Sequence, residues 1–566
     1  MSLKKAQFIS GGKIIVKILE DHKVKYVFGL IGSATMELFD SLYNNKKIKF
    51  IDVKDERTGT HIADGYARAS GKPGVIIAGQ NGPGVTNLVT GIAQSYKAFS
   101  PVISLGGDTS SDHKGKDSFQ EIDQDNLFIP ITKKTFRINN ILKIPQIFND
   151  AFKLALSPRC GPIHINLPRN ILSEKIFFKK YKKNIRYEIN PPSRKKIKKI
   201  IKILIKYPKT IIIAGAGIKH SKKGRNEVCK LAKILNVPIV TSAGHGDIIN
   251  YKEKLYLGQM GPRGNKVATK AVKDANLILA LGTRLGFNST FYSNKNINKK
   301  SKIIQIDIEK IALGRYFPVE LSLCTDATTF TEIISKELLK IKDKDKNKDN
   351  KWTNNFILER KKFLFDRDAN ANMNSKPIFP SGIFKVLREI LPSNSAITLD
   401  AGTLCLQATD MLNYSNSRSL FTPLDFGLVG FSFACGLGVK LAKPNSPVIS
   451  LMGDGGFGMT VSEITTAVKY KINTITIIMN NNSWGAEKAY QRDYYNKRFI
   501  GTNLKNPPFH RIARLYGAIG FKVNKLSDLR IKLKKALKIK KPVIINVDVD
   551  PNSIYSFRKD SFEHKK

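Results

Sequence analysis

An aspartate and a pair of asparagines in the C-terminal third of the chain have the chemistry of a metal site. Asp454 lies within Gly453-Asp454-Gly455, and Asn480-Asn481 follow after the 24 residues 456–479. Mg²⁺ takes an octahedron of oxygens, usually one or two protein carboxylates with amide carbonyls, water and phosphate. An aspartate and an asparagine brought to one place could therefore hold one such ion. Gly-Asp-Gly alone is also common in turns, so the flanking elements decide between the two interpretations.

Two short apolar runs are placed to bring these residues together. Pro447–Met452 leads to Asp454 and Thr474–Met479 leads to Asn480, and both runs are typical of strands buried in a parallel sheet. The segment Met459–Lys471 is expected to form the crossover helix between them. Ligands at the carboxyl ends of such strands lie where open α/β sheets bind phosphorylated molecules. The spacing therefore predicts a phosphate and magnesium site.

Strand-like runs separated by helix-length segments recur along all 566 residues, which is typical of an α/β protein. The length suggests about three domains of ~150–200 residues each. We expect doubly wound parallel-sheet domains at residues 1–175, 195–340 and 376–552, with a linker at 341–375 that contains a charge run. The other expected strands are Lys25–Ile31, Ile48–Val53, Gly74–Gly79, Pro101–Leu105, Pro162–Leu167, Thr210–Ala214, Val237–Thr241, Asn276–Leu281, Lys302–Asp307, Ala396–Asp400 and Pro542–Val547.

The composition excludes several classes of protein. The formal net charge is +49, but the lysines are spread along the chain without a recognition helix or an aromatic nucleic-acid motif, so we expect no nucleic-acid partner. No apolar run approaches the ~20 residues of a membrane helix, and the N-terminus does not resemble a signal peptide. Five cysteines without paired spacing predict neither disulfides nor zinc. We expect a cytoplasmic protein with no membrane partner.

The Gly-Asp-Gly and Asn-Asn spacing resembles the signature of thiamin-diphosphate-dependent enzymes, and the resemblance extends from about Val27 to about Val547. It implies pyrimidine-binding, central and diphosphate-binding domains, with thiamin diphosphate and Mg²⁺ as cofactors. It also implies Asp454, Asn481 and the backbone carbonyl of Ser483 as metal ligands. The remaining coenzyme contacts that the resemblance implies are at Asn81, Gly402, Thr403, Val429, Gly453, Gly455 and Gly456.

Glu56 matches the position of the carboxyl group that these enzymes place against the aminopyrimidine ring of the coenzyme. It lies five residues before His61-Ile-Ala-Asp-Gly-Tyr-Ala67, as the family pattern requires. Burial against an apolar ring favours the neutral form of a carboxyl group, which suits a proton donor. Asp52 and Asp55 are nearby acids but fall out of this register. Without the family pattern, Glu56 would be taken for a surface residue.

Within the acetolactate-synthase group of this family, four passages are most similar to the sulfoacetaldehyde acetyltransferases. They are 28–34, 80–84, 119–128, and 484–488 together with 498–502. The resemblance implies conversion of sulfoacetaldehyde and phosphate to acetyl phosphate and sulfite through an enamine on the coenzyme. It suggests catalytic roles for Ser33 and Gln120, and contacts of Ser33, Gln120, Trp484 and Lys488 with substrate or phosphate. Lys488 as an ordinary exposed lysine remains an alternative.

Three alternatives stay open from the sequence. The first is an acetolactate synthase or another thiamin-diphosphate 2-oxoacid decarboxylase or lyase. The second is a basic RNA-binding protein with a degenerate enzyme fold. The third concerns the central domain, which in some relatives holds FAD, although no specific residue here supports FAD. The family also implies a homodimer or homotetramer with active sites at subunit interfaces, and the sequence does not choose between these two assemblies.

Overall fold

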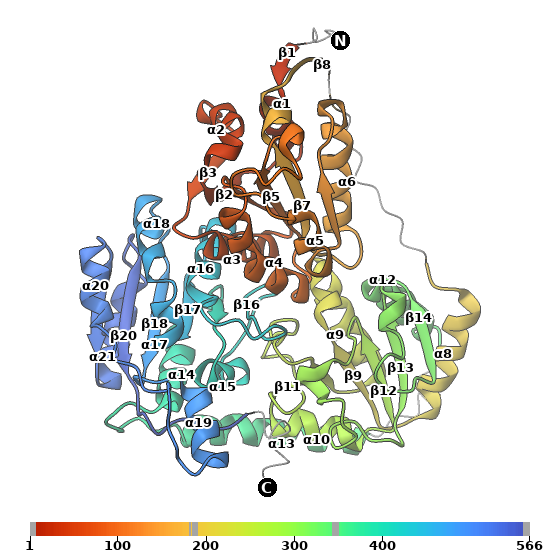
Figure 1. Ribbon diagram of the computed structural model, residues 1–566. Coiled ribbons are helices and arrows are strands. Elements are labelled where there is room, and N and C mark those ends of the chain that lie inside the picture. The colour runs from red at the N-terminus through yellow and green to blue at the C-terminus, as the bar shows by residue number, and fades with distance from the viewer. Residues whose placement is uncertain (1–6, 180, 182, 184–190, 342–349, 558–566) are drawn as a thin grey trace.

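The computed structural model describes residues 7–179, 181, 183, 191–341 and 350–557, and three six-stranded parallel sheets organise them. Each sheet belongs to one of three successive parts of the chain, and helices cover the sheets (Figure 1). The prediction of three α/β domains with parallel sheets is therefore confirmed.

The N-terminal sheet has the order β3-β2-β4-β5-β7-β6, and every neighbouring pair is parallel. Its strands are β2 (Tyr26–Leu30), β3 (Lys49–Asp52), β4 (Gly74–Ala78), β5 (Val102–Asp108), β6 (Lys134–Arg137) and β7 (Ile163–Pro168). Its helices are α1 (Gly11–Asp21), α2 (Met36–Tyr43), α3 (Glu56–Ser70), α4 (Pro83–Lys97), α5 (Gln124–Phe128), α6 (Ile144–Leu156) and α7 (Arg169–Ser173). A separate antiparallel ribbon joins β1 (Gln7–Ser10) to β8 (Lys175–Phe178).

The central sheet has the order β11-β10-β9-β12-β13-β14. Its strands are β9 (Thr210–Ala214), β10 (Ile239–Thr241), β11 (Tyr256–Gln259), β12 (Leu277–Leu281), β13 (Lys302–Asp307) and β14 (Leu321–Cys324). The helices of this region are α8 (Arg194–Lys206), α9 (Gly224–Leu235), α10 (Lys266–Asp274), α11 (Phe287–Thr290), α12 (Ala327–Leu338) and α13 (Asn350–Ala369). Helix α13 lies within the segment 341–375 that we expected to be a linker, and its Trp352 and Phe356 are buried in the central core. Residues 342–349 of that segment lie outside the described residues.

The C-terminal sheet has the order β16-β15-β17-β18-β20-β19. Its strands are β15 (Ala396–Leu399), β16 (Leu420–Phe421), β17 (Val448–Gly453), β18 (Ile475–Asn480), β19 (Ile519–Val523) and β20 (Val543–Asp548). Its helices are α14 (Pro380–Ile390), α15 (Thr403–Met411), α16 (Ser432–Ala442), α17 (Asp454–Gly458), α18 (Ile464–Lys469), α19 (Gly485–Tyr494), α20 (Phe509–Leu515) and α21 (Leu526–Ala536). The segment 459–471, expected to be a single crossover helix, contains a 3₁₀ turn at Val461–Glu463 followed by α18, and the short helix α17 precedes it. The helix is interrupted because Thr460 has a non-helical backbone (φ −132°, ψ 10°).

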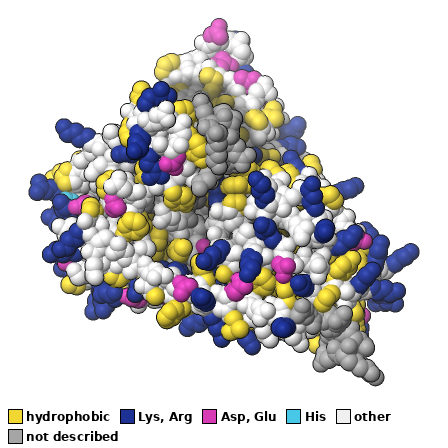
Figure 2. Space-filling model, turned by 90° about the horizontal axis from the view of Figure 1, so that it is seen from below, with side chains coloured by type: hydrophobic (Ala, Val, Ile, Leu, Met, Phe, Trp, Pro, Cys, Tyr) yellow, Lys and Arg dark blue, Asp and Glu magenta, His cyan; other side chains and the backbone are white. Residues whose placement is uncertain are grey.

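The basic charge is distributed over the surface instead of forming one groove. Helix α8 illustrates the cause, because Ile197, Ile200 and Leu204 are buried while its lysines face solvent. Figure 2 shows Lys and Arg side chains spread over the lower face of the molecule and mixed with hydrophobic and acidic ones. Such an amphipathic helix needs no partner for its charged face. In the described part of the chain, no helix is long and apolar enough to cross a membrane.

Helices α3 and α16 join the N-terminal and C-terminal domains through closely packed backbones. A Cβ atom on Gly65 would overlap the carbonyl oxygen of Cys435, and one on Gly438 would overlap that of Ile62. Side chains of both domains, among them Ile62 and Leu437, form one continuous buried cluster. The two domains of one chain therefore share a hydrophobic core, and α3 carries Glu56 at its first position.

The substitution Gly438→Ala tests this contact. The added methyl group overlaps the backbone of α3, which is less able to move than a side chain, so we expect destabilisation of about 1–3 kcal/mol, as for other overpacked cores. Thermal and denaturant unfolding measure the effect. Gly458→Ala is the control, since a Cβ there meets no atom within 4 Å. Equal stability of the two variants would contradict the close packing of α3 against α16.

Candidate active site

Asp454, Asn481 and Ser483 lie together where β17 and β18 end. The two strands are parallel neighbours, with Gly453 in register with Met479. Asp454 and Asn481 are both buried. Burial raises the pKa of Asp454, while hydrogen bonds from the Asn506 side chain and from the backbone of Asn481 and Ser483 lower it. A carboxylate, an amide oxygen and a carbonyl are the hard oxygen ligands that Mg²⁺ prefers. These residues could therefore hold the ion.

The surroundings of Asp454 fit a ligand with phosphate groups. A Cβ atom on Gly402 or Gly453 would meet no atom within 4 Å, so the backbone is open to close approach at both positions. Three buried polar atoms, Thr403 Oγ1, Asn481 Nδ2 and Ser483 Oγ, have no hydrogen-bond partner. Two of them face Gly485, whose Cβ would lie 3.2 Å from Thr403 Oγ1 and 3.4 Å from Asn481 Nδ2. Since buried polar groups are normally paired, this cluster fits a bound polar group.

Asp400 fixes the loops on the inner side of this site. Its Oδ1 accepts hydrogen bonds from the backbone of Ala401 (2.8 Å) and Phe431 (3.1 Å), and its Oδ2 accepts one from Gly430 (3.1 Å). Burial outweighs these donors and raises the pKa of Asp400 to about 7. A Cβ on Gly456 would lie 2.6 Å from Asp400 Oδ2 and 3.3 Å from Val429 Cγ1. Asp400 therefore ties the Val429 turn to the glycine-rich start of α17.

Glu56 is buried on the N-terminal side, at the first position of α3. Its Oε2 accepts a hydrogen bond from Asn87 Nδ2 on α4 at 3.1 Å. Burial raises the pKa of Glu56 above its ordinary value, and the Asn87 hydrogen bond opposes that shift. The cap residue Asp55 accepts from the backbone of Arg57 at 2.8 Å, which fixes the start of the helix. The carboxyl group thus has the raised pKa that suits proton donation.

A chain of polar side chains lies beside Glu56. A Cβ on Gly84 would lie 3.1 Å from Glu56 Oε1 and 3.2 Å from Gln80 Cβ, so both residues flank this glycine. Gln80 Oε1 accepts from Ser33 N at 2.9 Å and Ser33 Oγ at 3.1 Å, and Gln80 Nε2 donates to Gln120 Oε1. Asn81 Nδ2 donates to the carbonyl of Phe119 at 3.1 Å, and its Oδ1 lies 3.5 Å from Gln80 Nε2. The structure therefore brings Ser33 and Gln120 together through Gln80.

Trp484 and Lys488 lie on the Asp454 side. The Trp484 ring packs against the backbone of Gly455, whose Cβ would lie 2.5 Å from its Cζ3. Lys488, one turn into α19, donates to Asn503 Oδ1 at 2.9 Å, and its Nζ lies 5.7 Å from the centre of the Phe499 ring. Lys488 is half-buried and forms none of the ion pairs found among the described residues. It therefore supplies an uncompensated positive charge beside the metal half of the site.

The two halves of the predicted site do not meet directly in one chain. The side-chain contacts of Glu56, from Asn87 and Gly84, come from its own domain. The contacts of Asp454, from Asn506, Asn481 and Ser483, also come from its own domain. Each chain thus presents the predicted proton-transfer half and the predicted metal half in two domains that share a hydrophobic core around α3 and α16.

Four further residues of the site were not predicted as site residues from the sequence. Gln80 and Asn87 hold Gln120 and Glu56, and Asp400 organises the coenzyme loops. Asn506 Nδ2 donates to Asp454 Oδ2 at 2.5 Å and also lies within 3.3 Å of the side-chain oxygens of Asn480 and Asn482. Asp400 ends the predicted strand Ala396–Asp400 and Gln80 opens the passage 80–84, but Asn506 lies 52 positions from its partner and belongs to no motif.

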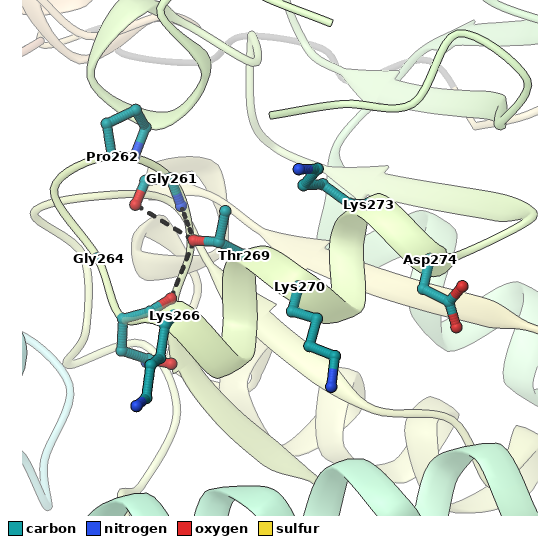
Figure 3. Close-up of a pocket in the computed structure, with 9 residues that line it drawn as sticks. Gly261, Pro262, Gly264, Lys266, Thr269, Lys270, Lys273 and Asp274 are labelled. Carbon is teal, nitrogen blue, oxygen red and sulfur yellow. Dashed lines mark hydrogen bonds between the residues drawn. The ribbon is translucent and has the colours of Figure 1, made fainter. Parts of the chain in front are cut away.

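A groove of about 600 Å³ on the central domain is distinct from this site (Figure 3). It is lined by the loop before α10 and by α10 itself. Thr269 Oγ1 bonds the backbone of Gly261 and Asn265, and Lys270 pairs with Glu359 at 2.7 Å. Its lining contains none of the predicted coenzyme or metal residues.

Comparison with known families agrees with this arrangement. The description "Thiamine pyrophosphate enzyme, N-terminal TPP binding domain" matches residues 9–127, the central domain of the same family matches 197–334, and its C-terminal TPP binding domain matches 400–547. Each match falls within one of the three parts of the chain that contain a six-stranded sheet. The chain belongs to the thiamine pyrophosphate enzyme family.

Its relatives within that family carry two different names. A probable acetolactate synthase large subunit of Methanococcus aeolicus is 32% identical, over 97% of this chain and 93% of the relative. A sulfoacetaldehyde acetyltransferase of Castellaniella defragrans is 31% identical, over 94% and 91%. An acetolactate synthase large subunit of Buchnera aphidicola subsp. Acyrthosiphon pisum is 31% identical, over 96% and 95%. The identities therefore do not separate the two activities.

The raised pKa of Asp454 predicts that coenzyme binding weakens in mild acid. In the predicted metal site Asp454 must be ionised to bind the ion, and its raised pKa means that it takes up a proton at a higher pH than an ordinary aspartate, whose pKa is 3.8. We expect the affinity for Mg²⁺-thiamin diphosphate to fall about tenfold per pH unit below that pKa. Calorimetric titration of wild type and Asp454→Asn across pH 4–8 separates this effect from titration of the diphosphate. An affinity ratio between the two proteins that is constant with pH would contradict it.

Proposed function

We propose that the protein is a sulfoacetaldehyde acetyltransferase that converts sulfoacetaldehyde and phosphate to acetyl phosphate and sulfite. The observation that carries this proposal is that the chain has polar groups for anionic substrates on both halves of the site. The Ser33–Gln80–Gln120 hydrogen-bond chain lies near Glu56, and Lys488, which forms no ion pair among the described residues, lies near Asp454. Both substrates are anions with several oxygen atoms, which hydroxyl and amide donors and a lysine ammonium bind well. Support also comes from the relatives that carry this name.

In this proposal, thiamin diphosphate supplies a stabilised carbanion when it is bound. Glu56 holds and returns a proton at its carboxyl group, and Asn87 keeps that group oriented. Asp454, Asn481 and the Ser483 carbonyl would hold Mg²⁺, and the open backbone at Gly402 and Gly453 would admit the diphosphate beside Gly455 and Gly456. Thr403 and Val429 contact the coenzyme, Asn81 holds the loop beside its pyrimidine end, and Trp484 closes the side of Gly455.

The proposed active unit is a homodimer or homotetramer. Glu56 and Asp454 each have partners from their own domain only, so a complete site forms when the N-terminal domain of one subunit faces the C-terminal domain of another. Exposed apolar side chains on both domains support this proposal. Ile31 and Phe119 are exposed on the N-terminal domain, and Phe426 and Ile500 are exposed on the C-terminal domain. We also propose a cytoplasmic location, as the sequence suggests.

Acetolactate synthase is the second candidate function. Relatives with that name match the chain as well as the acetyltransferases do. The two activities differ in the second substrate, which is a 2-oxoacid for the synthase and inorganic phosphate for the acetyltransferase. The polar Ser33–Gln80–Gln120 chain and Lys488 favour the smaller and more highly charged phosphate.

Replacing Glu56 with Gln tests the role of the carboxyl group. Proton transfer by a positioned side chain contributes about 10²–10⁴-fold, so we expect kcat to fall by that factor while coenzyme affinity, set by Asp454 and Asn481, is retained. Sulfite release and calorimetry measure the two quantities. Asp55→Asn is the control, because asparagine also caps a helix. Full activity of Glu56→Gln, or its loss in Asp55→Asn alone, would refute the assignment.

Substrate choice tests the proposed activity and Lys488 together. With sulfoacetaldehyde and phosphate we expect sulfite and acetyl phosphate, and with pyruvate no acetolactate. Loss of a charge-assisted hydrogen bond costs about 1.5–3 kcal/mol, so Lys488→Gln should raise the KM for an anionic substrate about 10- to 100-fold. The exposed Lys540 gives the control variant Lys540→Gln. Acetolactate from pyruvate without sulfite from sulfoacetaldehyde would establish the second candidate instead.

A further inference from the structure

Glu463 is a buried acid that the proposed chemistry does not use. It ends the 3₁₀ turn Val461–Glu463 of the C-terminal domain and is 0% exposed. Burial raises the pKa of Glu463, and the charge of another acid, Asp55, raises it further. A buried carboxyl group without a cation costs stability unless hydrogen bonds compensate it. Its hydrogen-bond partners therefore indicate what it does.

Two of those partners belong to the N-terminal domain, and a third, the side chain of Thr466, lies on α18 of its own domain. Glu463 Oε1 accepts from the backbone nitrogen of Lys54 at 2.8 Å and from Thr58 Oγ1 at 2.5 Å. Lys54 precedes Glu56 in the turn between β3 and α3, and Thr58 follows Glu56 in the first turn of α3. The carboxyl group thus bridges the two ends of the segment that presents Glu56.

Other contacts hold the same turn from the C-terminal domain. Arg57 Nη2 donates to the carbonyl of Met459 at 3.2 Å, and Thr466 Oγ1 donates to the carbonyl of Asp52 at 3.3 Å. Tyr470 donates from its hydroxyl to the side chain of Asp52. Within this group Glu463 alone is both fully buried and bonded on both sides of Glu56.

We propose that Glu463 is a positioning residue for Glu56, which it holds in place by fixing the β3–α3 turn from the C-terminal domain. This inference rests on the proposed function, in which Glu56 moves a proton of the coenzyme. A displacement of about 1 Å in a reacting group can lower the rate about 10²-fold. Contacts that fix the backbone next to Glu56 are therefore expected to affect the rate of proton transfer. The segment Asp454–Glu463 begins with the metal ligand and ends with this clamp, so it links the two half-sites that one chain presents.

The test measures proton exchange at the thiazolium carbon of bound thiamin diphosphate, by acid quench and NMR, alongside coenzyme affinity by calorimetry. We expect Glu463→Ala to slow exchange about 10- to 100-fold with coenzyme affinity unchanged within about threefold. Glu463→Gln keeps an acceptor oxygen and should restore most of the rate. Thr58→Val removes one of the two hydrogen bonds and should slow exchange less than Glu463→Ala. It also tests the clamp if Glu463→Ala does not fold.

Asp410→Asn is the matched control. Asp410 is another buried acid between domains, with its Oδ1 accepting from the backbone of Gln259 at 3.0 Å, but it lies away from α3. Replacing the Asp410 carboxylate with an amide should lower the melting temperature without slowing proton exchange at the thiazolium carbon. Normal proton exchange at the thiazolium carbon in both Glu463→Ala and Thr58→Val would overturn the clamp. If Glu463→Ala does not fold, normal exchange in Thr58→Val would overturn it. Normal exchange in Glu56→Gln would instead overturn the proposed function, so the two failures are distinguishable.

Discussion

The contact between α3 and α16 is the constraint on which the site depends. Gly65 and Gly438 let the two helix backbones touch, and the side chains around them form one core from two domains. Any larger residue at either position would separate the helices, and the start of α3 would move with them. Because Glu56 is the first residue of α3, the place of the carboxyl group is decided by packing along the whole helix.

Burial shifts the pKa of three acids of the site in the same direction, with a different consequence for each. It raises the pKa of Glu56, Asp454 and Asp400 alike, and in each case hydrogen-bond donors oppose it. For Glu56 the shift favours the protonated form, which suits the proposed role in proton transfer. For Asp454 the same direction of shift would oppose the proposed binding of Mg²⁺, and Coulomb attraction to the ion would have to offset it. For Asp400, three backbone donors convert a buried acid into a structural tie between loops.

The strands that the sequence did not predict are nearly all at sheet edges. The interior strands are apolar runs such as Thr210–Ala214 and were found, because both of their faces are buried. The edge strands β6, β11, β14, β16 and β19 are short, and those in Lys134–Arg137 and Ile519–Val523 carry charged residues. An edge strand pairs with a neighbouring strand on one side only and is less buried than an interior strand. Its sequence therefore lacks the continuous run of apolar residues that identifies an interior strand. The expected crossover helix failed for a local reason, the non-helical backbone at Thr460.

The sequence by itself determined the three α/β domains, the proximity of Asp454 to Asn481, and Glu56 as the acid to examine. Strand ends and short motifs suffice for these, since neighbouring parallel strands place their carboxyl ends together. Only the tertiary structure decided which groups hold them: Asn87 for Glu56, Asn506 for Asp454 and Glu463 for the turn beneath Glu56. These partners come from segments far apart in the chain, and a hydrogen bond between such segments depends on packing that no local pattern encodes.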